Sequence, residues 1–143
     1  MSILSENLQD LLLESNLDYK AFAAKIGISA SAITNYIKYE NLPTVNSIVK
    51  IADYFNCSID YLLGRVEDDW NSNFCKCPPF CERLKFLKEH FGVSNKFIYE
   101  HEKISKNRYF DWLSGKRVPT LESVIALAEI FDCSVDFVIG REN

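Results

Sequence analysis

The sequence contains little glycine and proline and no long apolar run. Only five glycines and four prolines occur among its 143 residues, so most of the chain is free to be helical. No stretch approaches the roughly 18–20 apolar residues that a membrane-spanning helix needs. The first residues show no basic segment followed by an apolar run, so we expect no signal peptide and a cytoplasmic location. With 48% hydrophobic and 25% charged residues, the chain has the composition of a globular protein.

Histidine is scarce, and the motifs of the common enzyme classes are missing from the sequence. The two histidines, His90 and His101, stand in no zinc-protease or catalytic-triad spacing. There is no glycine-rich phosphate loop and no nucleophile elbow. The acidic residues are scattered rather than paired. We therefore predict no enzymatic activity and no cofactor.

The five cysteines are an odd number, which argues against a disulfide framework in a chain without an export signal. Cys75, Cys77 and Cys81 form a C-x-C-x3-C cluster, and His90 could supply a fourth zinc ligand. Zinc sites usually open with C-x2-C spacing, so three reduced thiols are the favoured interpretation and no metal site is predicted. A zinc-linked redox or metal sensor is the weaker alternative.

An internal repeat organises the chain. Residues 42–65 reappear as residues 118–141, at an offset of 76 residues. The same offset runs back without a gap to Leu8 and Leu84, which indicates a duplication of the whole unit. The predicted organisation is a first domain at residues 1–65, a linker at residues 66–79 and a second domain at residues 80–143.

Each repeat offers five helices, marked by a regular series of capping residues, and the predicted fold class is all-α. In the first repeat the predicted caps are Ser5, Asp18, Ser29, Thr44 and Ser58. In the second repeat they are Ser94, Ser105, Thr120 and Ser134, and the first helix is expected to begin near Pro79 or Phe80.

The second and third helices of the first repeat, around residues 22–36, form the pattern of a helix-turn-helix. Gly27 can end the earlier helix in the left-handed conformation, and Ser29 can cap the later one. By helical spacing, Ile33 and Tyr36 turn back to the core. Small polar side chains are left on the outer side of a helix whose shape can enter a major groove.

These features resemble the lambda-repressor-like helix-turn-helix family of the Cro/Xre type, twice in one chain. In the first repeat the resemblance is carried by Phe22, Ala23, Gly27, Ile28, Ser29, Ile33, Pro43, Ala52, Phe55 and residues 58–64. In the second repeat it is carried by Ile104, Ser105, Trp112, residues 115–117, Pro119, Ala128, Phe131 and residues 134–140. The resemblance implies a five-helix bundle for each repeat, DNA binding through the third helix and a role in regulating transcription.

The two repeats depart from the family pattern at different points. The family usually has Gln at the start of the second helix, where it meets a phosphate; Tyr19 stands there in the first repeat and Asn95 in the second. The tightly packed Ala of the family is Ala23 in the first repeat but Tyr99 in the second. Lys103 replaces the turn glycine of the second repeat. A left-handed lysine costs about 1 kcal/mol more than glycine, so we expect that turn to be reshaped.

The distribution of charge favours the second repeat as the stronger DNA-binding unit. Residues 1–70 hold five Lys/Arg against ten Asp/Glu, and residues 71–143 hold eleven against ten, giving net charges of −5 and +1. The overall charge of −4 argues mildly against a nucleic-acid partner, but local charge matters more than the sum. Because each neutralised phosphate adds to counterion release, the second repeat should supply more of the affinity.

The candidate DNA-contacting residues lie along the third helix of each repeat, at the start of the second helix of the second repeat and in the loop that follows its third helix. In the first repeat they are Ser29, Ala30, Ser31, Thr34, Asn35 and Lys38. In the second repeat they are Asn95, Lys96, Ser105, Lys106, Asn107, Arg108, Asp111, Lys116 and Arg117. Arg can pair bidentately with guanine and Asn with adenine, whereas the basic loop suits backbone contact. A solvated surface is the alternative interpretation for each group.

The sequence thus predicts a repressor-like, sequence-specific transcriptional regulator that binds double-stranded DNA as an internal pseudo-dimer or a homodimer. Because the outer faces of the two third helices differ, the two half-sites of its operator should differ as well. The alternative is a protein-interaction or antitoxin-type module that has lost DNA binding in one or both repeats. The acidic first repeat and the departures at Tyr99 and Lys103 motivate that alternative.

Overall fold

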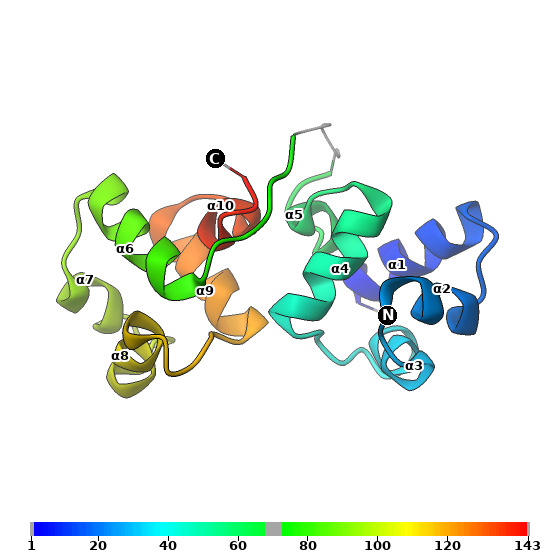
Figure 1. Cartoon of the computed structure of the whole chain (residues 1–143), viewed down its shortest axis with the longest axis horizontal. Helices are drawn as coiled ribbons and strands as arrows, with labels where there is room; N and C mark the ends of the chain where they lie inside the picture. The colour runs from blue at the N-terminus through cyan, green and yellow to red at the C-terminus, as the bar shows by residue number, and fades with distance from the viewer. Residues whose placement is uncertain (1, 68–72, 143) are drawn as a thin grey trace. The chain divides into compact units, whose positions relative to one another are not determined.

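The computed structural model describes residues 2–67 and 73–142, and the regular structure in these ranges is entirely helical (Figure 1). The chain separates into two compact units, unit 1 at residues 1–72 and unit 2 at residues 73–143. The helices of unit 1 are α1 (Ile3–Glu14), α2 (Tyr19–Ile26), α3 (Ala30–Lys38), α4 (Val45–Phe55) and α5 (Ile59–Leu62). Those of unit 2 are α6 (Phe80–Phe91), α7 (Asn95–Tyr99), α8 (Lys106–Ser114), α9 (Leu121–Phe131) and α10 (Val135–Ile139). The predicted all-α class is confirmed.

Side-chain caps begin most of the helices at the predicted residues. In each case the side-chain oxygen of the cap accepts a hydrogen bond from a backbone N–H in the first turn, which satisfies one of the donors that a helix start leaves open. The confirmed caps are Asp18, Ser29, Thr44, Ser58, Ser94, Ser105, Thr120 and Ser134. Helix α6 begins at Phe80 after Pro79, as expected, without a side-chain cap.

The predicted cap at Ser5 is wrong. Helix α1 begins earlier, and its cap is Ser2, whose hydroxyl oxygen accepts from the Ser5 N–H at 3.1 Å. Ser5 itself is buried in the first turn, where its hydroxyl donates to the carbonyl of Ile37 at 2.6 Å. A serine that bonds the end of α3 cannot be told from a cap by local sequence, because the partner lies 32 residues away.

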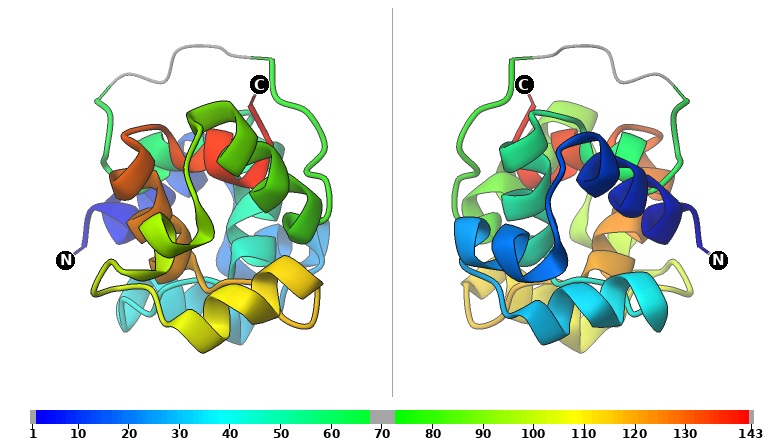
Figure 2. Two further views of the ribbon diagram at one scale, coloured as in Figure 1. Left: turned by 90° about the vertical axis from the view of Figure 1, so that its left-hand side faces the viewer. Right: turned by 90° about the vertical axis from the view of Figure 1, so that its right-hand side faces the viewer.

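The core of unit 1 lies behind α3 and leaves the outer side of that helix open. Phe22 of α2 is fully buried, with its ring 5.5 Å from that of Tyr54 and 5.3 Å from that of Phe55. Ile33 and Ile37 of α3 are buried as well. Within its own unit α3 runs along one edge, as both Figure 1 and the right-hand view of Figure 2 show.

Unit 2 repeats this plan with a more aromatic core. Tyr109 and Trp112 bury one side of α8, and the ring of Trp112 lies 6.3 Å from that of Phe80 on α6. Leu84 and Leu87 of α6 are fully buried beneath them. In the left-hand view of Figure 2, α8 (yellow) runs along the edge of unit 2, on the side away from α10.

A buried ion pair joins the last helix of unit 2 to the residues that follow it. The Asp136 carboxylate lies 2.7 Å from the Arg141 guanidinium, and both side chains are almost fully buried. The equivalent pair of unit 1, Asp60 and Arg65, has the same 2.7 Å separation but is more exposed on the arginine side. The two ion pairs are 76 residues apart in the sequence, so the two units share this contact as well as their helices.

Part of the predicted linker contacts unit 2. The N–H of Cys75 donates to the Arg141 carbonyl at 2.8 Å, and the Arg141 guanidinium lies 3.9 Å over the ring of Phe74. Residues 68–72 of that linker lie outside the described residues, so its extent stays a prediction. Among the residues described, no helix is both long enough and apolar enough to cross a bilayer.

Candidate nucleic-acid interface

The α2–α3 turn of unit 1 has the geometry that its sequence predicts. Gly27 adopts the left-handed conformation with φ of 72°, and its N–H donates to the Ala23 carbonyl at 2.9 Å. The Ser29 hydroxyl then accepts from the N–H of Ala32 at 3.1 Å and starts α3. This tight turn sets the two helices as a helix-turn-helix and fixes which side of α3 faces solvent.

The candidate contact residues of unit 1 lie along the solvent side of α3. Ser29, Ser31 and Lys38 are exposed, and Ala30, Thr34 and Asn35 are half-buried. The Thr34 hydroxyl donates to the Ala30 carbonyl at 3.1 Å, inside the helix. This surface can offer hydrogen bonds and small apolar contacts to base edges, but Lys38 is its one charged member.

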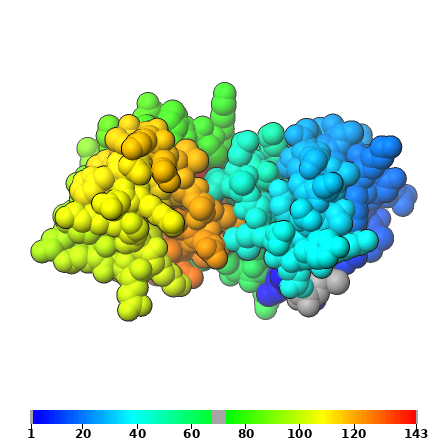
Figure 3. Space-filling model, turned by 90° about the horizontal axis from the view of Figure 1, so that it is seen from below, coloured from blue at the N-terminus to red at the C-terminus, as the bar shows by residue number. Residues whose placement is uncertain are grey.

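Helix α8 of unit 2 presents a more strongly charged surface. Its inner side is held by Tyr109 and Trp112, which are 0% and 3% exposed. Lys106, Asn107 and Arg108 are exposed at its start, next to the exposed cap Ser105. In Figure 3 this helix (yellow) lies open on the surface of its own unit. Two cations and an amide on one turn can contact both phosphates and base edges.

The turn between α7 and α8 is reshaped, as expected from Lys103. Helix α7 has five residues where α2 has eight, and it ends at Tyr99, the residue that replaces the small Ala23. The chain then continues to Ile104, whose N–H donates to the His101 carbonyl at 3.0 Å. Lys103 is not among the residues with positive φ, so the longer turn avoids the left-handed conformation altogether.

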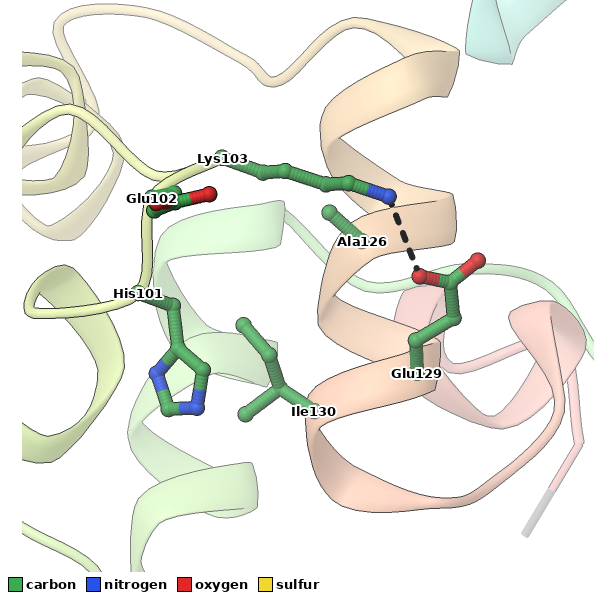
Figure 4. A pocket seen from close by; sticks show the side chains of 6 residues that line it. All are labelled: His101, Glu102, Lys103, Ala126, Glu129 and Ile130. Carbon is green, nitrogen blue, oxygen red and sulfur yellow. Dashed lines mark hydrogen bonds and ion pairs between the residues drawn. The ribbon is translucent and has the colours of Figure 1, made fainter.

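Lys103 points away from α8 and toward α9. Its ammonium lies 3.4 Å from the Glu129 carboxylate, and the lysine stem passes over Ala126 (Figure 4). The same figure shows the His101 ring and Ile130 on the other side of a pocket of about 460 Å³. The charge of Lys103 is therefore partly neutralised by Glu129 of α9, and Lys103 adds less to the charge beside α8 than its place in the sequence suggests.

The loop after α8 contains one exposed lysine and one paired arginine. Gly115 ends α8 with φ of 84°, and Lys116 is exposed directly after it. The guanidinium of Arg117 lies 3.6 Å from the carboxylate of Asp111. The backbone N–H of Arg117 also donates to the backbone carbonyl of Asp111 at 3.2 Å. Two predicted contact residues thus partly neutralise each other, which leaves Lys116 as the stronger candidate for a phosphate.

Asn95 at the start of α7 is held by a residue that the sequence did not single out. The buried Tyr109 donates its phenolic hydrogen to the Asn95 side-chain oxygen at 2.7 Å. A tyrosine phenol is protonated at neutral pH, and burial raises the pKa of Tyr109 further, to about 12. With its oxygen occupied, Asn95 retains the amide N–H groups that a phosphate would accept. The neighbouring Lys96 lies 3.7 Å from Glu100 and is largely exposed.

An exposed aromatic residue on α8 was also missed from the sequence. Phe110 is 40% exposed and follows directly on the fully buried Tyr109. An apolar residue inside a helix is readily taken for core. The signal that could have identified it is the repeat itself, because Phe110 matches Thr34, a position already assigned to the outer side of α3.

The cysteine cluster does not gather into a metal site in the described ranges, where no three His, Cys, Asp or Glu side chains come together to hold an ion. Cys75, Cys77 and Cys81 form no disulfide bond. The Cys75 thiol instead donates weakly to the carbonyls of Gly140 and Arg141, at 3.3 and 3.4 Å. This part of the cluster therefore helps to hold the chain against the end of α10.

Comparison with known families matches each unit separately. Residues 8–62 match a family model described as helix-turn-helix, and residues 81–136 match a second model described as a helix-turn-helix domain. Every candidate contact residue falls inside one of these two matched ranges. No solved structure matches the chain.

Three curated bacterial relatives match over 49 to 62 residues. The Cryptic phage CTXphi transcriptional repressor RstR of Vibrio cholerae is 47% identical over 34% of this chain and 44% of its own length. The HTH-type transcriptional regulator AnsR of Bacillus subtilis is 34% identical over 43% of this chain and 53% of its own length. The uncharacterized HTH-type transcriptional regulator YobD of Bacillus subtilis is 28% identical over 43% and 54%. The chain thus spans about half the length of the curated relatives it matches.

Proposed function

This chain consists of two helix-turn-helix domains of the lambda-repressor-like (Cro/Xre) type, and from this premise we propose that it is a sequence-specific, repressor-like transcriptional regulator. Its partner is double-stranded DNA, read by α3 and α8 in the major groove. The names of the three relatives, all transcriptional regulators or repressors, support the same function.

The observation that carries this proposal is the outer surface of α8. Lys106, Asn107 and Arg108 stand exposed on the first turn of a helix whose other side is locked into the core. A rigid helix is the support that base recognition needs, because loosely held side chains lose specificity. Lys116 at the end of the helix can add a phosphate contact that positions the helix without reading sequence.

The two domains are proposed to read two different half-sites. Related single-domain proteins bind as dimers, with recognition helices about 34 Å apart in successive major grooves. Two fused domains can form an internal pseudo-dimer on one operator. Lys106 and Asn107 of α8 stand where α3 has Ala30 and Ser31, so the preferred bases should differ between half-sites. A homodimer of the whole chain would instead select a palindrome.

Selection of binding sites from random duplexes by the intact chain tests the proposal directly. We expect a bipartite, non-palindromic site. Arg108→Ala should relax the base preference in one half-site at a cost of about 1–3 kcal/mol, because a bidentate arginine contact to guanine is lost. Lys85→Ala, at an exposed lysine of α6, is the matched control and should leave the selected sequence unchanged.

Two outcomes would count against the proposal. If the chain enriches no sequence and retards no duplex at low salt, DNA binding is excluded. The protein-interaction or antitoxin-type alternative would then be favoured by co-purification of a stoichiometric partner protein. If Arg108→Ala leaves both half-sites as selective as before, the role assigned to Arg108 is wrong although the function stands.

A further inference from the structure

Phe110 is an exposed aromatic side chain on the charged side of α8. It is 40% exposed, whereas the neighbouring Tyr109 is fully buried. Lys106 is one turn earlier on the same side of the helix, and both residues are exposed. In unit 1 the same two positions are Thr34 and Ala30, small residues that cover far less surface. The exposed part of the Phe110 ring therefore lies among cations at the surface rather than in the core of the unit.

Two further rings support Phe110 from behind. Its ring centroid lies 5.8 Å from that of Tyr99 at the end of α7 and 5.4 Å from that of Tyr109. The Lys106 ammonium lies 5.3 Å over the face of the same Tyr99 ring. Tilted and edge-to-face contacts of this kind are favourable, so the Phe110 ring is held in place without being covered. This contact also accounts for the large side chain of Tyr99, which stands where unit 1 has the small Ala23.

The chemistry of the major groove indicates what such a ring would contact. The base edges there are mostly polar, and their largest apolar group is the C5-methyl of thymine, which apolar side chains including Phe contact. A held aromatic ring also loses little conformational freedom when it binds. We propose that Phe110 is a specificity-determining residue that reads a thymine methyl in the half-site bound by unit 2. This inference rests on the proposed function.

Removal of single methyl groups from the DNA tests it. In the duplex selected by the intact chain, each thymine of the unit 2 half-site is replaced in turn by deoxyuridine, which lacks only the C5-methyl. For the wild-type protein we expect one replacement to raise Kd about fourfold, the effect of exposing one methyl-sized apolar group. For Phe110→Ala the same replacement should leave Kd unchanged. Phe110→Leu keeps an apolar side chain and should retain part of the discrimination.

The controls separate this inference from the proposed function. Lys116→Ala should weaken binding to thymine and uracil duplexes equally, and Thr34→Ala should leave the uracil effect intact. If the wild-type protein binds its selected duplex but no uracil replacement changes Kd, or if Phe110→Ala keeps the full effect, the role of Phe110 is refuted while the function stands. If the wild-type protein binds no duplex at all, the proposed function and this inference fall together.

Discussion

Tyr109 links the core of unit 2 to its candidate DNA-binding surface. Its ring is fully buried beside Trp112, with ring centroids 6.4 Å apart, while its hydroxyl reaches Asn95 at the start of α7. The matching residue of unit 1 is Ile33, which has no hydroxyl. Tyr109 was not singled out from the sequence, and its hydrogen bond to Asn95 depends on how α7 and α8 pack.

We expect Tyr109→Phe to weaken DNA binding through Asn95. The change keeps the buried ring and removes one hydrogen bond, worth about 1 kcal/mol or roughly fivefold at most. The loss should be uniform across DNA sequences because a phosphate contact carries no sequence information. Titration of a fluorescent duplex measures it. In an Asn95→Ala background the second change should add nothing, and additive losses would contradict the link between the two residues.

The raised pKa of Tyr109 predicts how stability falls at alkaline pH. Burial raises that pKa to about 12, against about 10 for an unfolded tyrosine. The folded chain therefore favours the neutral phenol, and the stability that depends on it is fully present below pH 10. It is lost as the pH rises from about 10 through 12, because the unfolded chain ionises first.

Urea unfolding at pH 8, 10 and 11 measures this loss. Tyr109→Phe cannot ionise at this position, so its free energy of unfolding should decline less steeply between pH 10 and 11 than that of the wild-type protein. Tyr39→Phe removes a phenol that is 69% exposed and serves as the matched control. Equal slopes for wild-type and Tyr109→Phe proteins would show that the buried phenol does not govern alkaline stability.

At the scale of helices and turns, most starts were predictable and two features were not. Caps such as Ser29 and Thr120 depend on a side chain and a backbone N–H three residues away, so the sequence contains all the information. Ser5 differs because its partner, the Ile37 carbonyl, is remote in the sequence. The reshaped turn before α8 could be expected from Lys103, but its path and the Lys103–Glu129 pair could not.

The two helix-turn-helix turns should respond differently to substitution. Gly27 has φ of 72° and no atom within 4 Å of an added Cβ. The only cost of Gly27→Ala is therefore the strain of holding an alanine in the left-handed conformation. We expect a loss of about 1 kcal/mol in the free energy of unfolding. Lys103 is not left-handed and its side chain forms only an exposed ion pair, so Lys103→Ala should cost about 0.5 kcal/mol or less.

Chemical denaturation of the intact chain at neutral pH compares the two variants. The pair is informative because Gly27 and Lys103 occupy the same position of the repeat. Similar losses for both would mean that Lys103 matters to its turn in a way that the exposed pair with Glu129 does not explain. No loss for Gly27→Ala would mean that the α2–α3 turn can rearrange as its counterpart in unit 2 has done.

At the scale of the whole chain, the offset of 76 residues was the most informative feature of the sequence. It predicted five helices in each unit because a hydrophobic pattern that recurs in one register must fold the same way twice. It could not predict contacts that have no counterpart in the other repeat. Phe74 and Cys75, which contact the end of α10, precede the repeated region and were read as linker from their composition.

The unequal division of charge between the units predicts an unequal dependence on salt. Exposed lysines lie in or beside each helix-turn-helix: Lys20, Lys25 and Lys38 in unit 1, and Lys96, Lys106 and Lys116 in unit 2, where the exposed Lys103 is set aside because it pairs with Glu129 of α9. Unit 1 surrounds its lysines with a net negative charge, which opposes their approach to phosphates. If Lys96, Lys106 and Lys116 each contact one phosphate, their triple alanine variant should lower the slope of log K against log salt by about 2.7.

The equivalent triple variant of unit 1 should lower that slope by less than half as much. Because both variants remove three positive charges from one chain, the change in net charge is matched and only its location differs. Affinities for the selected duplex at four salt concentrations between about 50 and 200 mM, where counterion release is well resolved, give both slopes. An equal or larger change from unit 1 would reverse the assignment, because the acidic unit would then neutralise more phosphates than the unit with the basic helix.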